Sequence, residues 1–257
     1  MNNNPIGVYD SGFGGLSVWQ ELHRALPNES LLYLGDGKNC PYGSQSVERI
    51  RVLAEEAVSV LVERGAKMVV VACNTATAAA IAHLRERFSQ IPIVGLEPAI
   101  KPACLESKSR IVGVLATERS LKGEKFLNTL TKYGEGVEVI KVVGEGFVEA
   151  VERNLEDDPA TEELVRRAVE PIIEGGADII VLGCTHYPFL RHVIERVIGD
   201  RNVRIIDSGH AVSKRVESLL DQFAIRAEAD NQAHLEFLTF ADEEYRLRLI
   251  AKAMGEK

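Results

Sequence analysis

The chain has 257 residues, of which 46% are hydrophobic and 26% charged, and its formal net charge at pH 7 is −8. This composition is typical of a globular protein with a real core. The acidic balance argues against nucleic acid and anionic membranes as partners, since both need clustered Lys and Arg. No segment approaches the roughly 18 apolar residues of a membrane span, and the opening MNNNPIGVYD lacks the features of a secretion signal. We therefore expect a cytoplasmic protein whose four cysteines are reduced.

The first 36 residues predict a strand, a glycine-rich turn, a helix and a second strand. The apolar segment 5–9 runs into DSGFGG at 10–15, and apolar residues then recur at helical spacing from Leu16 to Leu26. A turn of this kind before a helix offers free backbone N–H groups to an anion. The second strand, 31–36, ends at Asp36 and leads into the turn-rich loop GKNCPYGSQS.

Two later segments are near copies of each other. They are GAKMVVVACNTA at 65–76 and GADIIVLGCTHY at 176–187, at an offset of 176 − 65 = 111 residues. The apolar run in each predicts a buried strand of a parallel sheet. Cys73 and Cys184 would follow the carboxyl ends of these strands, which is the edge where ligands bind in open α/β sheets. We also predict that a helix begins directly after each cysteine and favours its thiolate form.

The second half repeats the order of the first. Residues 110–117 match the first strand, with Gly113 in the place of Gly7 (113 − 7 = 106), and further strands are predicted at 91–98, 137–143 and 203–209. Everything from Ala211 onward is predicted to be mostly helical, with a polar break near Asp230. Alternation of strands and helices indicates the α/β class. We predict two similar α/β lobes, 1–97 with 208–257 and 98–207, each a mainly parallel sheet flanked by helices. A pseudo-twofold repeat would relate them, with the active site in the cleft between.

Several functions are compatible with these patterns. Thiols on either side of a bound carbon centre could remove and return a proton without a cofactor, although a lone buried cysteine is usually a small core residue. The glycine-rich turn and Asp36 also suit a nucleotide-binding oxidoreductase, but Ser17 stands where the fingerprint has Gly or Ala. A metal or redox site of Cys73, Cys184 and His186 lacks zinc-ligand spacing. A non-catalytic binding protein on the same scaffold stays open.

Five segments carry a more specific signal. In chain order, IGVYDSGFGGLSV, YLGDGKNCPYGSQS, VVVACNTATA, GVLATERSL and VLGCTHYPFL resemble the cofactor-independent glutamate racemases of the aspartate/glutamate racemase family. The resemblance covers nearly the whole chain. It implies an isomerase that interconverts L- and D-glutamate without pyridoxal phosphate or metal and supplies D-glutamate for peptidoglycan. It also implies a homodimer, and it leaves aspartate racemase as the nearest alternative.

The resemblance implies roles for individual residues. Cys73 would be the base toward D-glutamate and Cys184 the base toward L-glutamate. Asp10 would lie near Cys73, and Glu152 and His186 would assist Cys184 in proton transfer. The residues implied in substrate binding are Asp10, Ser11, Pro41, Tyr42, Gly43, Cys73, Asn74, Thr75, Thr117, Cys184, Thr185 and His186.

The chain departs from the family pattern at two places. GEGFVEAVE is looser than the usual motif, so Glu149, one helical turn away, is an alternative to Glu152. Position 120 is Ser, where the family often has Thr, but a hydroxyl is retained.

Overall fold

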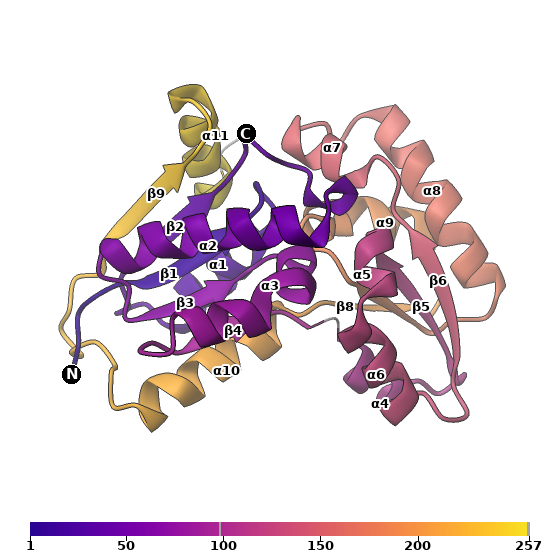
Figure 1. Cartoon of the computed structure of the whole chain (residues 1–257). Coiled ribbons are helices and arrows are strands. Elements are labelled where there is room, and N and C mark those ends of the chain that lie inside the picture. Colours follow the sequence, from indigo (N-terminus) through magenta and orange to yellow (C-terminus); the bar gives the residue numbers. More distant parts are fainter. Residues whose placement is uncertain (98, 256–257) are drawn as a thin grey trace. The chain divides into compact units, whose positions relative to one another are not determined.

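The computed structural model describes residues 1–97 and 99–255, which form two compact units (Figure 1). Unit 1 comprises Met1–Leu96 and Gly209–Lys257, and unit 2 comprises Glu97–Ser208. These bounds differ by one residue from the limits predicted from the sequence. Each unit has one parallel sheet with helices on both faces. The predicted α/β class, with two parallel sheets flanked by helices, is confirmed.

Unit 1 contains five parallel strands in the order β4-β3-β1-β2-β9. They are β1 (Ile6–Asp10), β2 (Leu31–Gly35), β3 (Met68–Val71), β4 (Ile93–Gly95) and β9 (Leu235–Thr239). The flanking elements are α1 (Leu16–Ala25), α2 (Val47–Glu63), α3 (Asn74–Arg87), α10 (Gly209–Gln222), α11 (Glu243–Met254) and the 3-10 turn η1 (Tyr42–Ser44). Apolar residues of α2 and α3 share one core with strands β1 to β3, and Trp19 of α1 packs against Phe237 of β9.

Unit 2 contains four parallel strands in the order β6-β5-β7-β8. They are β5 (Ile111–Ala116), β6 (Glu138–Val143), β7 (Ile179–Leu182) and β8 (Arg204–Ile206). The flanking elements are α4 (Ile100–Glu106), α5 (Glu118–Lys122), α6 (Glu124–Tyr133), α7 (Phe147–Glu152), α8 (Pro159–Glu174), η2 (Tyr187–Leu190) and α9 (Arg191–Ile198). One face of the sheet packs on α7, α8 and α9, and the other on α4 and α6.

The two units repeat one topology, because β1 to β4 and β5 to β8 occur in the same spatial order. The repeated Gly-Ala pair has a structural reason. Gly65 and Gly176 end α2 and α8 with φ angles of +85° and +84°, a left-handed conformation that glycine adopts without steric cost. In each copy the next alanine N–H donates back across the helix end, from Ala66 to Leu61 and from Ala177 to Ile172, as in a Schellman motif.

The prediction of mostly helical structure from Ala211 onward is wrong at 235–239. This segment is β9, which pairs in parallel with β2 and places Phe237 opposite Tyr33. Its five residues are half-buried except for Phe237. A short edge strand carries a weak alternation of apolar and polar residues. The pairing with a strand some 200 residues earlier is what determines its conformation (235 − 31 = 204).

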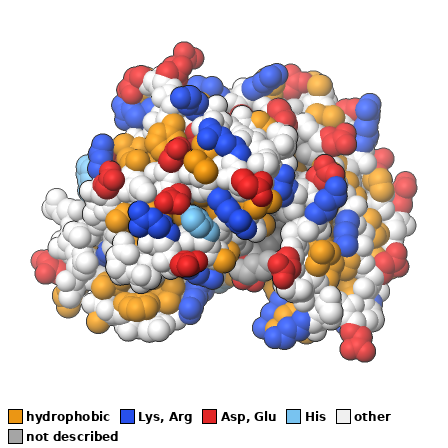
Figure 2. All heavy atoms as spheres, viewed as in Figure 1, with side chains coloured by type: hydrophobic (Ala, Val, Ile, Leu, Met, Phe, Trp, Pro, Cys, Tyr) orange, Lys and Arg blue, Asp and Glu red, His pale blue; other side chains and the backbone are white. Residues whose placement is uncertain are grey.

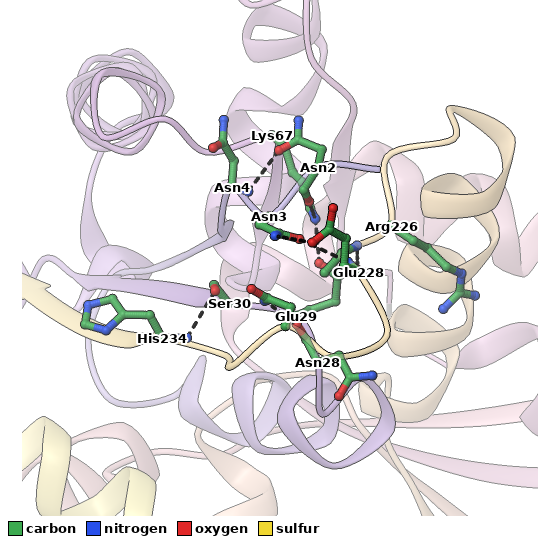
Figure 3. Close-up of polar contacts among 12 residues, drawn as sticks. Asn2, Asn3, Asn4, Asn28, Glu29, Ser30, Lys67, Arg226, Glu228 and His234 are labelled. Carbon is green, nitrogen blue, oxygen red and sulfur yellow. Dashed lines mark hydrogen bonds and ion pairs between the residues drawn. The ribbon is translucent and has the colours of Figure 1, made fainter.

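A buried ion pair joins three segments at the amino-terminal end of the unit 1 sheet (Figure 3). Nζ of Lys67, just before β3, lies 2.6 Å from Oε2 of Glu29, and the two side chains are 1% and 4% exposed. Lys67 also donates to the carbonyl of Asn2. The other carboxylate oxygen of Glu29 accepts from the backbone N–H of Ala227 at 2.8 Å. The pair therefore ties the N-terminal arm and the segment leading to β9 onto the sheet.

Charged side chains of both signs cover the surface. On the face in Figure 2, acidic and basic side chains are interspersed. Several ion pairs form along helices of the described chain, such as that of Arg166 with Glu162 at 2.9 Å. Among the described residues, no helix has both the length and the apolar character needed to cross a lipid bilayer. That nucleic acid is not a partner stays a prediction.

Candidate active site

Cys73 lies where β3 meets α3 in unit 1. Its backbone is extended, with φ −132° and ψ 118°, and it forms the N-cap of α3. The sulfur accepts a hydrogen bond from the backbone N–H of Ala76 at 3.4 Å, and the residue is 5% exposed. Free N–H groups and the helix dipole stabilise negative charge at such a position. The predicted helix start after Cys73 is confirmed, and it favours a thiolate there.

Two predicted residues, Asp10 and Ser11, lie where β1 meets the glycine-rich loop. Asp10, the last residue of β1, is fully buried, and its Oδ1 accepts from the N–H of Gly12 at 2.8 Å. Oγ of Ser11 lies 3.6 Å from Sγ of Cys73. A Cβ at Gly15 would lie 2.5 Å from Cβ of Asp10, so only glycine lets the loop return this closely. The ends of β1 and β3 thus bring Ser11 and Cys73 into contact.

A chain of buried hydrogen bonds holds the neighbouring loop. The hydroxyl of Tyr9 donates to that of Tyr42 at 2.7 Å, and Tyr42 donates to Oδ2 of Asp36 at 2.6 Å. The side-chain amide of Asn39 donates to Oδ1 of Asp36 at 2.9 Å. Burial, reinforced by nearby negative charge, raises the pKa of both phenols well above their usual value. Both tyrosines therefore stay protonated and act as hydrogen-bond donors.

The hydrogen bonds just described include Tyr9 and Asp36, two residues that the sequence analysis did not assign to the site. Asp36 was considered only as a ribose ligand, yet both of its oxygens accept hydrogen bonds from within unit 1. The position of Asp36 at the end of a predicted strand was the sequence signal that could have assigned it to the site. Pro41 and Gly43 flank the fixed Tyr42.

Asn74 and Thr75 open α3, and both are buried. The buried Oδ1 of Asn74 has no hydrogen-bond partner within the described part of the chain. Buried polar atoms are rarely left unsatisfied. This oxygen is therefore an acceptor available to a donor group of a ligand, such as an ammonium.

Cys184 has a different environment in unit 2. Its sulfur lies 3.8 Å from Nδ1 of His186, and Nε2 of that imidazole lies 2.6 Å from Oε1 of Glu152. Cys184 and His186 are 7% and 3% exposed. A carboxylate on one ring nitrogen fixes the orientation and tautomer of an imidazole, and leaves the other nitrogen to exchange a proton with the thiol. Of the two acidic candidates, Glu152 contacts the histidine.

The prediction that a helix begins directly after Cys184 is wrong. A 3-10 turn, η2, occupies Tyr187–Leu190, and α9 begins only at Arg191. Proline disfavours the α conformation in the residue before it, so Pro188 interrupts a helix that would run on from Thr185. The two thiols thus have different neighbours. The sulfur of Cys73 lies at a helix N-terminus, and that of Cys184 lies beside an imidazole.

The remaining predicted residues of unit 2 lie near the ends of β5 and β7. Oγ1 of Thr117, the N-cap of α5, donates to Oγ of Ser120 at 2.8 Å and accepts from its N–H at 3.2 Å. Thr185 is buried beside Cys184. The hydroxyl of Tyr187 donates to the carbonyl of Gly144 at 3.2 Å, and burial together with the charge of Cys184 raises its pKa.

Each unit therefore carries one buried thiol near the carboxyl end of a central strand, with hydroxyl or imidazole groups beside it.

Comparison with known proteins identifies one family. The profile of the Asp/Glu/hydantoin racemase family matches residues 6–216. A glutamate racemase from Ectopseudomonas mendocina is 48% identical over 89% of this chain and 87% of its own.

Two solved structures support the same relationship. A glutamate racemase isoform from Bacillus anthracis has a TM-score of 0.86 at 32% identity, over 100% of this chain and 96% of its own. The Escherichia coli glutamate racemase, solved with L-glutamate and the activator UDP-MurNAc-Ala, has a TM-score of 0.86 at 30% identity, over 97% and 95%.

Proposed function

The chain belongs to the Asp/Glu/hydantoin racemase family, and from this premise we propose that it is a glutamate racemase that interconverts L- and D-glutamate without a cofactor. One observation carries the proposal. Within a chain 48% identical to a glutamate racemase, the repeated strand ends each present a buried cysteine, Cys73 and Cys184. Inversion of an α-carbon needs one group to remove a proton from one face and another to deliver a proton to the opposite face.

In the proposed mechanism both cysteines act on one substrate molecule. The thiolate of Cys73 takes the α-proton of D-glutamate, and the thiol of Cys184 gives its proton to the opposite face of the planar carbanion that results. The reverse reaction exchanges these roles. Cys73 needs a stabilised thiolate, which the N–H of Ala76 supports. Cys184 exchanges its proton with His186, whose orientation Glu152 fixes.

The weakly acidic α-proton is the chief obstacle, because glutamate has no cofactor to spread the carbanion charge. Donors aimed at the α-carboxylate lower this barrier most effectively in a water-excluded site. We propose that Ser11, Asn74, Thr75, Thr117 and Thr185, together with the loop of Pro41, Tyr42 and Gly43, bind the carboxylates and the ammonium. Asp10 assists on the Cys73 side. Ser11, Tyr42, Asn74, Thr75 and Thr185 are buried, which supports the proposal.

We also propose what the product is used for, where the protein is located and how it is assembled. The D-glutamate would serve peptidoglycan synthesis, as the family resemblance implies. We place the protein in the cytoplasm, because two-thiol chemistry needs reduced cysteines and all four cysteines are free. We propose a homodimer on the resemblance alone. Within each subunit, we propose two domains, residues 1–97 plus 208–257 and residues 98–207.

The test is circular dichroism of L-glutamate, and separately of L-aspartate, incubated with the purified reduced protein in deuterated water without added cofactor. Decay of the glutamate signal to zero with deuterium at Cα is the expected result. Decay with aspartate alone would show that the protein is an aspartate racemase instead. No decay with either substrate would refute the proposal. As controls, Cys73→Ser and Cys184→Ser should each abolish racemisation while the far-ultraviolet spectrum is retained.

A further inference from the structure

Tyr245, on α11, lies against two loops that carry proposed site residues of unit 1. Its ring stacks on Phe13 of the glycine-rich loop, with centroids 4.6 Å apart and planes at 18°. Its other neighbour is Gly37, where an added Cβ would lie 2.5 Å from the ring. Phe13 is fully buried. One ring from the C-terminal helix therefore fills the space between the loop after β1 and the loop after β2.

The two loops are also bonded to each other. The N–H of Asp36 donates to the carbonyl of Asp10 at 3.0 Å, and the N–H of Gly37 donates to the carbonyl of Ser11 at 2.9 Å. Ser11 is the residue whose hydroxyl lies 3.6 Å from the Cys73 sulfur. A shift of the ring would therefore move the backbone that holds Ser11 against Cys73.

α11 is fixed so that it can hold this position. Asp242 caps the helix by accepting from the N–H of Tyr245 at 2.9 Å. At the other end, the side chain of Gln20 donates to the carbonyls of Lys252 and Ala253 at 3.3 and 3.1 Å. The guanidinium of Arg248 lies 5.0 Å from the Phe13 centroid and 5.8 Å from the Tyr245 centroid, a cation–π arrangement that strengthens the stack.

We propose, resting on the racemase function proposed above, that Tyr245 is a positioning residue for the proton transfer at Cys73. It is not among the residues proposed to bind or transform glutamate. Its ring sets the loop that holds Ser11 beside the thiol. Positioning errors of about 1 Å reduce rates by up to about 100-fold. The stack on Phe13 and the contact with Gly37 are made by the ring, so a phenyl ring should serve equally.

Two variants of Tyr245 test the role, with a control on the same helix and a fallback substitution. Tyr245→Ala should lower kcat/KM by about 10- to 100-fold, and by the same factor for both enantiomers, because the equilibrium constant of a racemisation is unity. Tyr245→Phe should stay within about twofold of wild type, since stacking is retained. Leu247→Ala changes an exposed residue of the same helix and is the matched control, with no expected effect. If Tyr245→Ala fails to fold, Tyr245→Leu keeps the apolar volume without the ring.

Kinetic isotope effects separate positioning from simple loss of folded protein. A slower transfer at Cys73 makes that step more rate-limiting. The effect on kcat/KM with α-deuterated D-glutamate should therefore rise in Tyr245→Ala, while the effect with α-deuterated L-glutamate should fall. A variant that is merely less stable has fewer active molecules with unchanged isotope effects, and that result would overturn the proposal.

The alkylation rates of the two thiols depend on the same geometry and can be measured without glutamate. Iodoacetamide labelling followed by peptide mass spectrometry gives separate rates for Cys73 and Cys184, which depend on access and thiolate fraction. In Tyr245→Ala the ratio of the two rates should change by about threefold or more, and in Tyr245→Phe it should not. If the wild type does not racemise glutamate, the proposed function fails but this ratio still decides the placement of Tyr245. An unchanged ratio would refute it.

Discussion

Replacing Lys67 by Met should destabilise unit 1 strongly, because it leaves the Glu29 carboxylate buried without its cation. Removing one partner of a buried pair costs about 3–5 kcal/mol. The lower end applies here, since Glu29 keeps its hydrogen bond from the Ala227 N–H. A loss of about 3 kcal/mol corresponds to a fall of about 6–12 °C in the melting temperature of a unit of this size.

The chain has a built-in reporter for this measurement. Its single tryptophan, Trp19, is buried in α1 of unit 1, so tryptophan fluorescence follows the unfolding of the unit that contains the ion pair. Far-ultraviolet circular dichroism follows both units together. Urea titrations with the two probes would give the free energy of unfolding of unit 1 and show whether the units unfold together.

Two further variants make the comparison specific. Arg24→Met removes an exposed i,i+3 ion pair with Glu21, and should change stability by less than about 1 kcal/mol. In the double variant Lys67→Met with Glu29→Gln, the amide oxygen can still accept from Ala227, and stability should largely recover. A Lys67→Met protein within about 1 kcal/mol of wild type would refute the reasoning about the unpaired charge.

Two more predictions concern unit 2. Glu152→Gln retains a hydrogen bond to the histidine but removes its charge, a difference of about 1–1.5 kcal/mol, and should lower kcat/KM about tenfold. A change within twofold would argue against the proposed role of Glu152 in orienting His186. Burial would raise the pKa of Asp178, but hydrogen bonds from Ser107, Ser109 and Lys108 outweigh it and lower that pKa to about 2. The unfolded chain therefore takes up this proton first, and stability should fall as the pH drops from about 4 toward 2. Chemical denaturation of Asp178→Asn should show a smaller loss over that range; an equal loss would contradict this account.

Features encoded in short segments could be predicted from the sequence. The apolar runs before Cys73 and Cys184 are long enough to mark buried strands, and they form β3 and β7. The repeat of Gly65 and Gly176 reflects a local backbone requirement, a left-handed helix end that each copy satisfies alone. Such signals need no knowledge of distant residues.

Features that depend on distant partners could not be predicted in this way. The strand at 235–239 is set by pairing with β2. The turn after Cys184 is different, because its cause, Pro188, is local and the capping types at Thr185 and His186 outweighed it in the sequence analysis. The contact between Glu152 and His186 joins residues 34 positions apart. The helix pattern around Glu152 offers Glu149 equally, and only the packing of α7 selects between the two.

The discontinuity of unit 1 has a consequence for the order in which the molecule is made. A ribosome polymerises residues 97–208, all of unit 2, before it polymerises β9 or α11. Domains fold as units during synthesis, so the nascent chain holds a complete Cys184 half beside a four-stranded sheet whose β2 edge is still unpaired. Tyr245 is made later still, on α11. The Cys73 half therefore acquires its final loop packing only after α11 has been made, when the whole of unit 2 already exists.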